Sequence, residues 1–177
     1  MHRPRFAVLS LLILAAAGAR LLPHPPNFAP LAAMALFGGA HFADKRLAFA
    51  VPLAALLLSD AVLGFYDGMF AVYGSFALIV CLGLAVRSRR TPVPIAGSAL
   101  ASSVLFFAVT NFAVWTAGAL YPRTPAGLVA CYTAAIPFFQ NTLAGDAFFT
   151  AVLFGGFALA EKRWPVLADP ALAPVPA

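Results

Sequence analysis

Charged residues are scarce in this sequence: only 10% of its 177 residues are Asp, Glu, Lys or Arg. Soluble domains carry roughly 25% charged residues, because their surfaces must be hydrated. Here 63% of the residues are hydrophobic, and the mean hydropathy is +0.93. The composition therefore excludes a soluble enzyme, a nucleic-acid-binding domain and a disordered chain. It predicts a single integral membrane domain.

Cysteine and the common catalytic motifs are also scarce. The two cysteines both lie in apolar runs and form neither a disulfide framework nor a CxxC metal site. The sequence contains no G-x-x-x-x-G-K-[ST] phosphate loop, no H-E-x-x-H zinc pair and no G-x-S-x-G nucleophile motif. We therefore predict a protein that is not an enzyme and that has no catalytic residues, no metal site and no cofactor.

The few charges divide the chain into apolar segments close to the ~20 residues that a helix needs to cross a membrane. We predict an all-α bundle of six transmembrane helices in one domain over residues 1–165, with a disordered tail over residues 166–177. Pro137 disfavours helix at the residue before it, so we expect a break there and a short outer helix at 126–136. The predicted spans are 6–22, 28–42, 47–65, 69–86, 95–120 and 138–160.

The lysines and arginines predict the orientation. If the N-terminus is cytoplasmic, only Arg20 and Arg123 fall outside, and all the other basic residues fall inside. This bias places both termini in the cytoplasm, and the pI near 9.8 is then an orientation signal. One alternative stays open, because residues 1–19 also resemble a signal peptide that ends in an Ala-Gly-Ala cleavage motif. Its removal would leave five spans.

Polar side chains collect in the outer halves of the predicted spans, whereas the inner halves are nearly all apolar. A carboxylate in hydrocarbon costs about 2.5–3.5 kcal/mol, so it normally faces a partner or a water-filled cavity. Two carboxylates and several amides at similar depth predict a polar cavity that opens to the outside and binds a small molecule. The candidate substrate-binding residues are His24, Asn27, Asp60, Asn111, Trp115, Arg123, Asn141 and Asp146.

These candidates also have structural explanations. Asp60 and Asp146 would then cap helix ends, and Asn111 and Asn141 would hold helices together by hydrogen bonds. Trp115 would be an ordinary interfacial aromatic residue. The rival hypothesis is accordingly a membrane scaffold or accessory protein without a ligand. A third hypothesis is a small ion-coupled carrier that uses the two carboxylates.

Five motifs carry a family resemblance, and they lie at 20–30 (RLLPHPPNFAP), 58–60 (LSD), 110–115 (TNFAVW), 121–124 (YPRT) and 141–146 (NTLAGD). Together they resemble a family of small uncharacterised bacterial membrane proteins over residues 20–163. That family is in turn similar to the S components of energy-coupling factor (ECF) transporters, which are substrate-capturing subunits for vitamins.

The resemblance implies a bacterial inner-membrane protein that takes up a vitamin or cofactor precursor through an outer pocket. It also implies an ECF coupling module, a transmembrane subunit plus ATPases, as a possible partner beside the ligand and membrane lipid, and no nucleic acid. S components meet this module through small-xxx-small motifs on the first span, which assigns the partner interface to Ala15 and Ala19. Some S components resemble solitary cobalamin carriers, for which His24 or Cys131 would be the candidate cobalt ligand.

Overall fold

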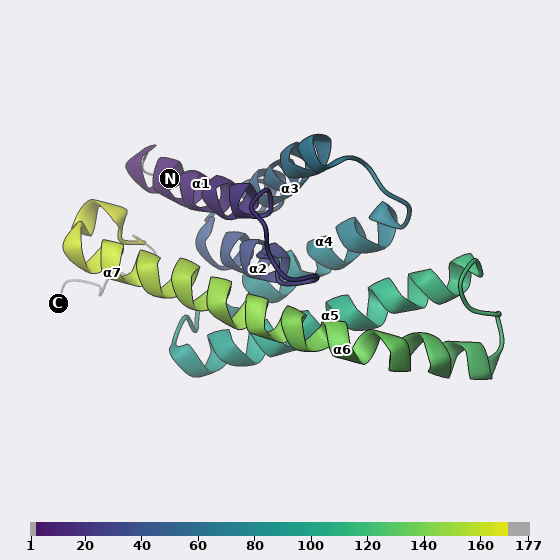
Figure 1. Cartoon of the computed structure of the whole chain (residues 1–177). Helices are drawn as coiled ribbons and strands as arrows, with labels where there is room; N and C mark the ends of the chain where they lie inside the picture. Colours follow the sequence, from purple (N-terminus) through teal and green to yellow (C-terminus); the bar gives the residue numbers. More distant parts are fainter. Residues whose placement is uncertain (1–2, 170–177) are drawn as a thin grey trace.

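A computed structural model describes residues 3–169, and these residues form helices and loops without any strand. This confirms the predicted all-α class (Figure 1). A π-helical turn, η1 (Ala151–Gly155), joins the sixth helix to α7 (Gly156–Arg163), and a 3-10 turn, η2 (Pro165–Leu167), follows. The six helices before η1 are α1 (Arg3–Ala19), α2 (Leu31–His41), α3 (Lys45–Leu63), α4 (Met69–Val86), α5 (Pro92–Ala117) and α6 (Pro125–Thr150).

Among the described residues, four helices are long and apolar enough to cross a membrane: α3, α4, α5 and the continuous helix Pro125–Arg163. Helix α2 has 11 residues, so it is ~16 Å long against a hydrocarbon core of ~30 Å. The helix within the predicted span 28–42 is therefore shorter than predicted, and a full crossing by this segment is not confirmed. Membrane character is supported by four helices, and the count of six spans stays a prediction.

Helix α6 runs without interruption through Pro137. The predicted break at this residue, with a separate short helix at 126–136, is wrong. A proline inside a helix loses one backbone hydrogen bond, but membrane helices tolerate it because neighbouring groups satisfy the freed carbonyl. Helix α3 likewise continues through Pro52.

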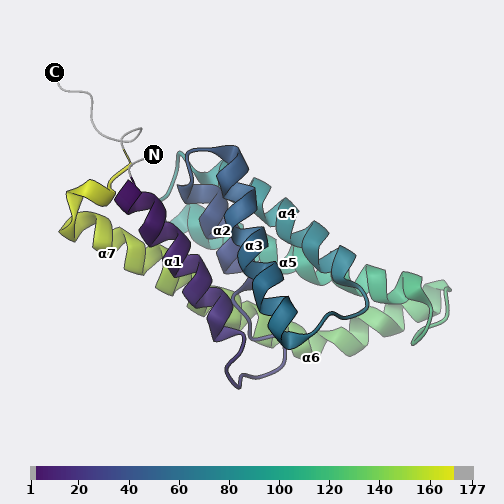
Figure 2. The ribbon, with the colours of Figure 1, turned by 90° about the horizontal axis from the view of Figure 1, so that it is seen from above.

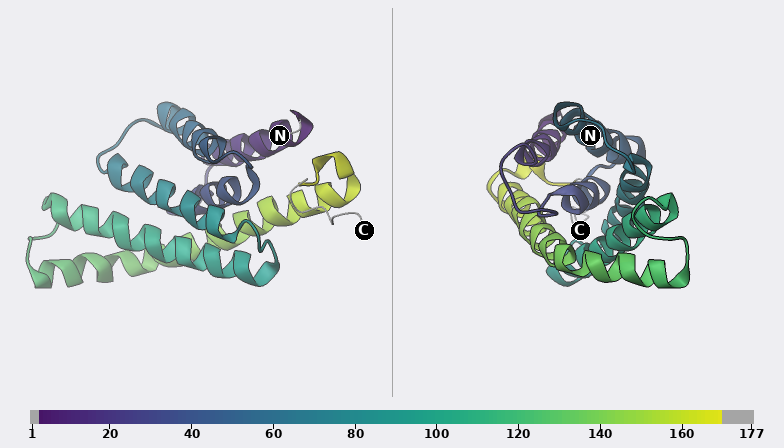
Figure 3. Two further views of the ribbon diagram at one scale, coloured as in Figure 1. Left: turned by 180° about the vertical axis from the view of Figure 1, so that it is seen from behind. Right: turned by 45° about the vertical axis from the view of Figure 1, so that its right-hand side comes forward.

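Helix α2 lies at the centre of the bundle, with the other helices around it (Figure 3, right). Ten of its 11 residues are buried. A Cβ on Gly39 would collide with the backbone carbonyl of Val80 in α4, and a Cβ on Gly83 of α4 would collide with the carbonyl of Leu36. These two glycines therefore allow α2 and α4 to cross at backbone contact distance, as small residues do between membrane helices.

The first and last described helices meet at one end of the molecule, which we call the basic end because Arg5, Lys45, Arg87, Arg90 and Lys162 lie there. Loops 20–30, 64–68 and 118–124 lie toward the opposite end, the loop end (Figure 2). The α5–α6 hairpin extends beyond the other helices at the loop end.

Part of the segment predicted to be a disordered tail is ordered. Leu167 is 4% exposed, and Asp169 forms an ion pair with Arg90 at 2.8 Å. The prediction of disorder is therefore wrong for residues 166–169. Composition alone could not predict the contacts of these residues with the basic end. Residues 170–177 lie outside the described part of the chain.

Candidate functional site

Loop 20–30 is fastened to the C-terminal half of α6. Nδ2 of Asn141 donates a hydrogen bond to the carbonyl of Pro26 at 2.9 Å. One turn further along α6, a Cβ on Gly145 would lie only 3.1 Å from the backbone nitrogen of Ala29. The absence of a side chain at Gly145 therefore lets the loop backbone lie directly on the helix.

A tight turn shapes the same loop. The N–H of Phe28 donates to the carbonyl of Pro25 at 3.0 Å, and Asn27 has a φ of +63°. Proline followed by a residue with positive φ is typical of a type II turn, and asparagine tolerates this conformation better than most residues. The turn places Asn27 on the wall of a cavity.

The cavity lies between this loop and helices α2–α6, and its volume is about 460 Å³. Its apolar wall includes the rings of Phe106, Phe107 and Phe138. Loop 20–30 contributes the polar side chains of Arg20, His24 and Asn27. The helices contribute Thr110, Asn111, Thr142 and Asp146. The cavity thus combines one cation and one carboxylate with hydroxyl, amide and imidazole groups on an aromatic background.

Asp60 does not line this cavity but holds Arg20, which does. Its Oδ1 lies 2.7 Å from Nη2 of Arg20, and its Oδ2 accepts a hydrogen bond from the Tyr73 hydroxyl at 2.9 Å. Arg20 also donates to the hydroxyl of Ser59. Asp60 is fully buried and Arg20 is 9% exposed, so this ion pair is shielded from solvent. It joins the end of α1 to α3 and α4.

Asp146 is 3% exposed and accepts two hydrogen bonds. The Ser103 hydroxyl donates to its Oδ2 at 2.6 Å, and the backbone N–H of Ala32 donates to the same carboxylate. Ala32 lies in the first turn of α2, where backbone N–H groups lack helical partners and favour a negative charge. Asp146 therefore caps α2 from α6.

The remaining predicted site residues are divided between the cavity and the tip of the α5–α6 hairpin. Nδ2 of Asn111 donates to the carbonyl of Phe107 at 2.8 Å, while its side chain lines the cavity. Nε1 of Trp115 donates to the carbonyl of Pro122, and Nη2 of Arg123 donates to the carbonyl of Ala117, at 3.1 and 3.2 Å. Trp115 and Arg123 thus stabilise the hairpin tip and are not among the residues that line the cavity.

Four predicted residues therefore meet at the cavity: His24, Asn27, Asn111 and Asp146. Sequence reasoning missed Arg20, Thr110 and Thr142, and it treated the phenylalanines only as a general apolar background. A signal for Arg20 was present, because a buried Asp60 requires a cation and Arg20 follows directly after an apolar helix. Cys131 is 2% exposed and its thiol donates to the backbone carbonyl of Asn111, so it is not on the cavity wall.

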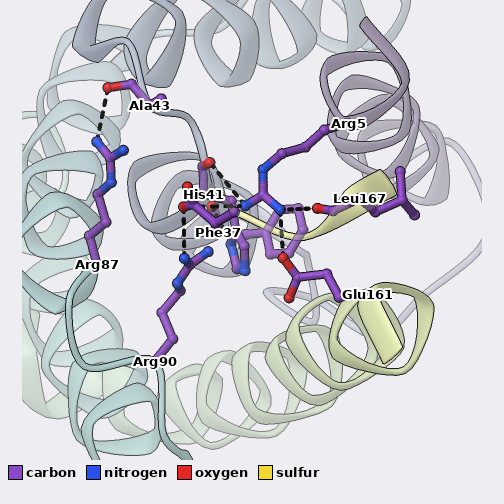
Figure 4. A network of polar contacts seen from close by, with 9 residues as sticks. Arg5, Phe37, His41, Ala43, Arg87, Arg90, Glu161 and Leu167 are labelled. Carbon is purple, nitrogen blue, oxygen red and sulfur yellow. Dashed lines mark hydrogen bonds and ion pairs between the residues drawn. The ribbon is translucent and has the colours of Figure 1, made fainter. Parts of the chain in front are cut away.

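A second polar cluster lies at the basic end, where sequence reasoning expected only orientation signals (Figure 4). Arg5 is 2% exposed, lies 2.5 Å from Oε1 of Glu161 and also donates to the carbonyl of Leu167. Arg90 pairs with Asp169, which lies 3.7 Å from Arg5 as well. Burial lowers the pKa of the Arg90 guanidinium from its ordinary value, and the Asp169 carboxylate opposes that shift. The network ties α1 and the connection between α4 and α5 to the end of the described chain.

Beside this network lies a wide groove, which we call the basic-end groove, between α5 and the helix formed by α6, η1 and α7. Its volume is about 1260 Å³, and it extends from Arg90 and Lys162 to Ser103 and Asp146. Most of its lining is apolar, with Ala96, Ala99 and Leu100 on α5. Asp146 lines both this groove and the loop-end cavity.

The predicted partner-interface residues lie on α1. Ala15 is exposed and Ala19 is half-buried. Gly18 is also exposed, and nothing lies near the position that a side chain there would take. The opposite side of α1 packs into the core through Leu9 and Ile13, which are fully buried. One side of α1 is therefore available for a contact, and it carries small residues beside the exposed Leu11 and Leu14.

The fold and the two cavities define a class: an all-α protein with four helices that can cross a membrane and a polar cavity at one end. The chain belongs to a family of unknown function (DUF6580), which matches residues 1–167. No curated protein and no solved structure matches the chain.

Proposed function

We propose that this protein is the substrate-binding membrane subunit of an uptake system for a small ring-bearing molecule, such as a vitamin or cofactor precursor. The observation that carries this proposal is the loop-end cavity. Its volume of about 460 Å³ lies within the range of about 300–1,000 Å³ that is typical of small-molecule sites. Its few polar groups lie on a mainly apolar wall, which is also typical of such sites.

The lining favours a ligand that has both a flat ring and a negatively charged or strongly polar group. Phe106, Phe107 and Phe138 offer faces and edges against which a ring packs. Arg20 is held in place by Asp60 and Ser59, and its guanidinium suits a carboxylate or phosphate. Its orientation is therefore fixed before a ligand arrives, which lowers the entropy cost of binding.

In this proposal the loop end faces outward and the basic end faces the cytoplasm of a bacterium, as the positive-inside bias favours. The ligand enters beneath loop 20–30, which Asn141 of α6 fastens by a hydrogen bond to the carbonyl of Pro26. The subunit then acts alone or docks on an ECF-type coupling module. The exposure of Ala15 supports a helix contact on α1 for that partner.

A scaffold or accessory role is the second candidate, and the hydrogen bonds of Asp146 favour it. This carboxylate accepts hydrogen bonds inside the protein from Ser103 and from the first turn of α2. Asp60 is likewise used by Arg20 and Tyr73. Substituting either carboxylate therefore disturbs folding and binding together, so neither substitution separates the two roles.

A cavity-filling substitution separates them. Ala135 lines the loop-end cavity, whereas its exposed neighbour Ala134 on α6 does not. Ala135→Trp fills the cavity without removing a hydrogen bond, and Ala134→Trp is the matched control. Native mass spectrometry of each protein, purified in mild detergent from its own host, then detects co-purified small molecules.

We expect a small organic adduct on the wild type and on Ala134→Trp, and its loss from Ala135→Trp with an unchanged melting temperature. An adduct that survives in Ala135→Trp contradicts the assignment of the cavity as the binding site. Spectra without any adduct, on proteins that melt alike, favour the scaffold role.

A further inference from the structure

The basic-end groove has the wrong size for the ligand proposed above. Its volume of about 1260 Å³ exceeds the about 300–1,000 Å³ of ordinary small-molecule pockets. Most of its wall is apolar, and Leu100 within it is 56% exposed. In a membrane such a surface meets lipid rather than water, so the groove opens sideways toward acyl chains.

The length of the groove matches one leaflet. Along α5 it extends from Pro92 to Ser103, eleven positions apart. At 1.5 Å per residue this is about 17 Å. Half of a hydrocarbon core of ~30 Å is about 15 Å. An acyl chain that starts at the basic end therefore reaches the polar Ser103–Asp146 pair near the middle of the membrane.

The basic end of the groove carries an unused hydrogen-bond donor. The Arg90 side chain is 10% exposed, and its Nη2 pairs with Asp169 at 2.8 Å. Its Nη1 is buried and has no hydrogen-bond partner among the described residues. A buried guanidinium nitrogen without a partner costs free energy, and a phosphate oxygen is the acceptor that suits it best.

The charge at this end is also complementary to an anion. Three cations, Arg5, Arg90 and Lys162, lie with two carboxylates, Glu161 and Asp169. Lys162 is exposed at the rim of the groove. The π-helical turn η1 also lies along the groove, and such turns are frequent at functional sites.

We propose that the basic-end groove binds one anionic glycerophospholipid from the adjacent leaflet. Its phosphate accepts a hydrogen bond from Nη1 of Arg90 next to Lys162, and an acyl chain lies along α5 toward Ser103. This site is separate from the loop-end cavity, and it does not depend on the uptake function proposed above.

The test is native mass spectrometry of the delipidated full chain titrated with dioleoyl phosphatidylglycerol. Arg90→Gln removes the proposed phosphate donor, and Arg89→Gln changes the exposed arginine beside it as a control. Ala96→Phe fills the groove from an exposed position that lines it, and Ala101→Phe changes an exposed position of α5 that does not. Inorganic phosphate serves as the competitor without acyl chains.

We expect one bound phosphatidylglycerol on the wild type. Arg90→Gln and Ala96→Phe should each weaken binding roughly tenfold, as the loss of a charge-assisted hydrogen bond or of the apolar seat implies. The two control variants should bind within about twofold of the wild type, because exposed charges contribute little. Inorganic phosphate at the same concentration should not displace the lipid.

Four results would overturn the proposal. Equal weakening by Arg90→Gln and Arg89→Gln would show only general attraction to a basic surface. Unchanged binding in Ala96→Phe would place the lipid elsewhere, and this variant decides alone if Arg90→Gln does not fold. Displacement of the lipid by inorganic phosphate would show that Arg90 binds a free anion. A dimer that dissociates in Ala96→Phe would show that the groove binds a second copy of the chain.

Discussion

The two ends of this protein use the same pair of long helices, α5 and α6, for different surfaces. At the loop end, the helices present hydroxyl, amide and carboxylate groups to a cavity of about 460 Å³ beneath loop 20–30. Toward the basic end, they present mainly alanine, leucine and isoleucine to a groove of about 1260 Å³. The cavity suits a compact polar ligand, whereas the groove suits a chain-like apolar one. Asp146, which lines both, marks the boundary between them.

Each end also contains a buried arginine, but the two are compensated differently. Arg20 depends on Asp60, which is fully buried and also accepts from Tyr73. Arg5 is shared between Glu161, Asp169 and the carbonyl of Leu167. Arg20 thus has one carboxylate partner at the loop end, whereas Arg5 at the basic end keeps other partners when one is removed.

The largest effect we predict follows from this difference. Asp60→Ala leaves the Arg20 guanidinium buried without its carboxylate, and breaking a buried pair costs about 3–5 kcal/mol. Glu161 is 25% exposed, and Arg5 keeps its other partners, so Glu161→Ala should cost about 1–3 kcal/mol. Unfolding of both variants in the same detergent, followed by circular dichroism, measures the comparison. Equal losses of stability would show that the basic-end network has no redundancy.

A smaller effect is expected at the boundary between the cavities. Asp146→Ala removes the acceptor of Ser103 and of the α2 N-terminus, which should cost about 1–3 kcal/mol. Asp146→Asn keeps an acceptor oxygen and should recover much of that stability. Phosphatidylglycerol binding should change little in Asp146→Asn, because the proposed phosphate site lies at Arg90. A tenfold loss of lipid binding in this variant would show that the two cavities are not independent.

The smallest effect is expected at the fastening of the loop. Asn141→Ala removes one hydrogen bond to Pro26, with a net cost of about 0.5–1.5 kcal/mol. Hydrogen exchange of residues 20–30 should become faster in this variant, while exchange in α2 remains unchanged. Gln140→Ala alters the exposed neighbouring residue and serves as the control. Faster exchange in both variants alike would mean that Asn141 does not hold the loop.

The sequence predicted the helical class and the collection of polar residues at one end, because both follow from composition and from the cost of polar groups in hydrocarbon. It could not predict that α6 continues through Pro137, since the local preference against helix before proline is overridden where neighbouring groups satisfy the freed backbone carbonyl. It could not separate Asn111 at the cavity from Trp115 at the hairpin tip, although both lie in one short motif.

The basic residues illustrate a second limit of prediction from the sequence. The positive-inside bias treats Arg5 and Arg90 as solvated orientation signals. In the structure both are largely buried. Arg5 pairs with Glu161 and Arg90 pairs with Asp169, each over 70 positions away in the sequence. Pairing over such separations depends on which helix ends meet, and this cannot be read from a single sequence.

The most direct test of two separate sites is one native mass spectrum that counts both ligands. The protein purified from its own host should carry a small organic adduct and one anionic phospholipid. Ala135→Trp should lose only the small adduct, and Ala96→Phe should lose only the lipid. If either variant loses both ligands, the loop-end cavity and the basic-end groove are not independent binding sites. If both variants keep both ligands, the assignment of these two sites is contradicted.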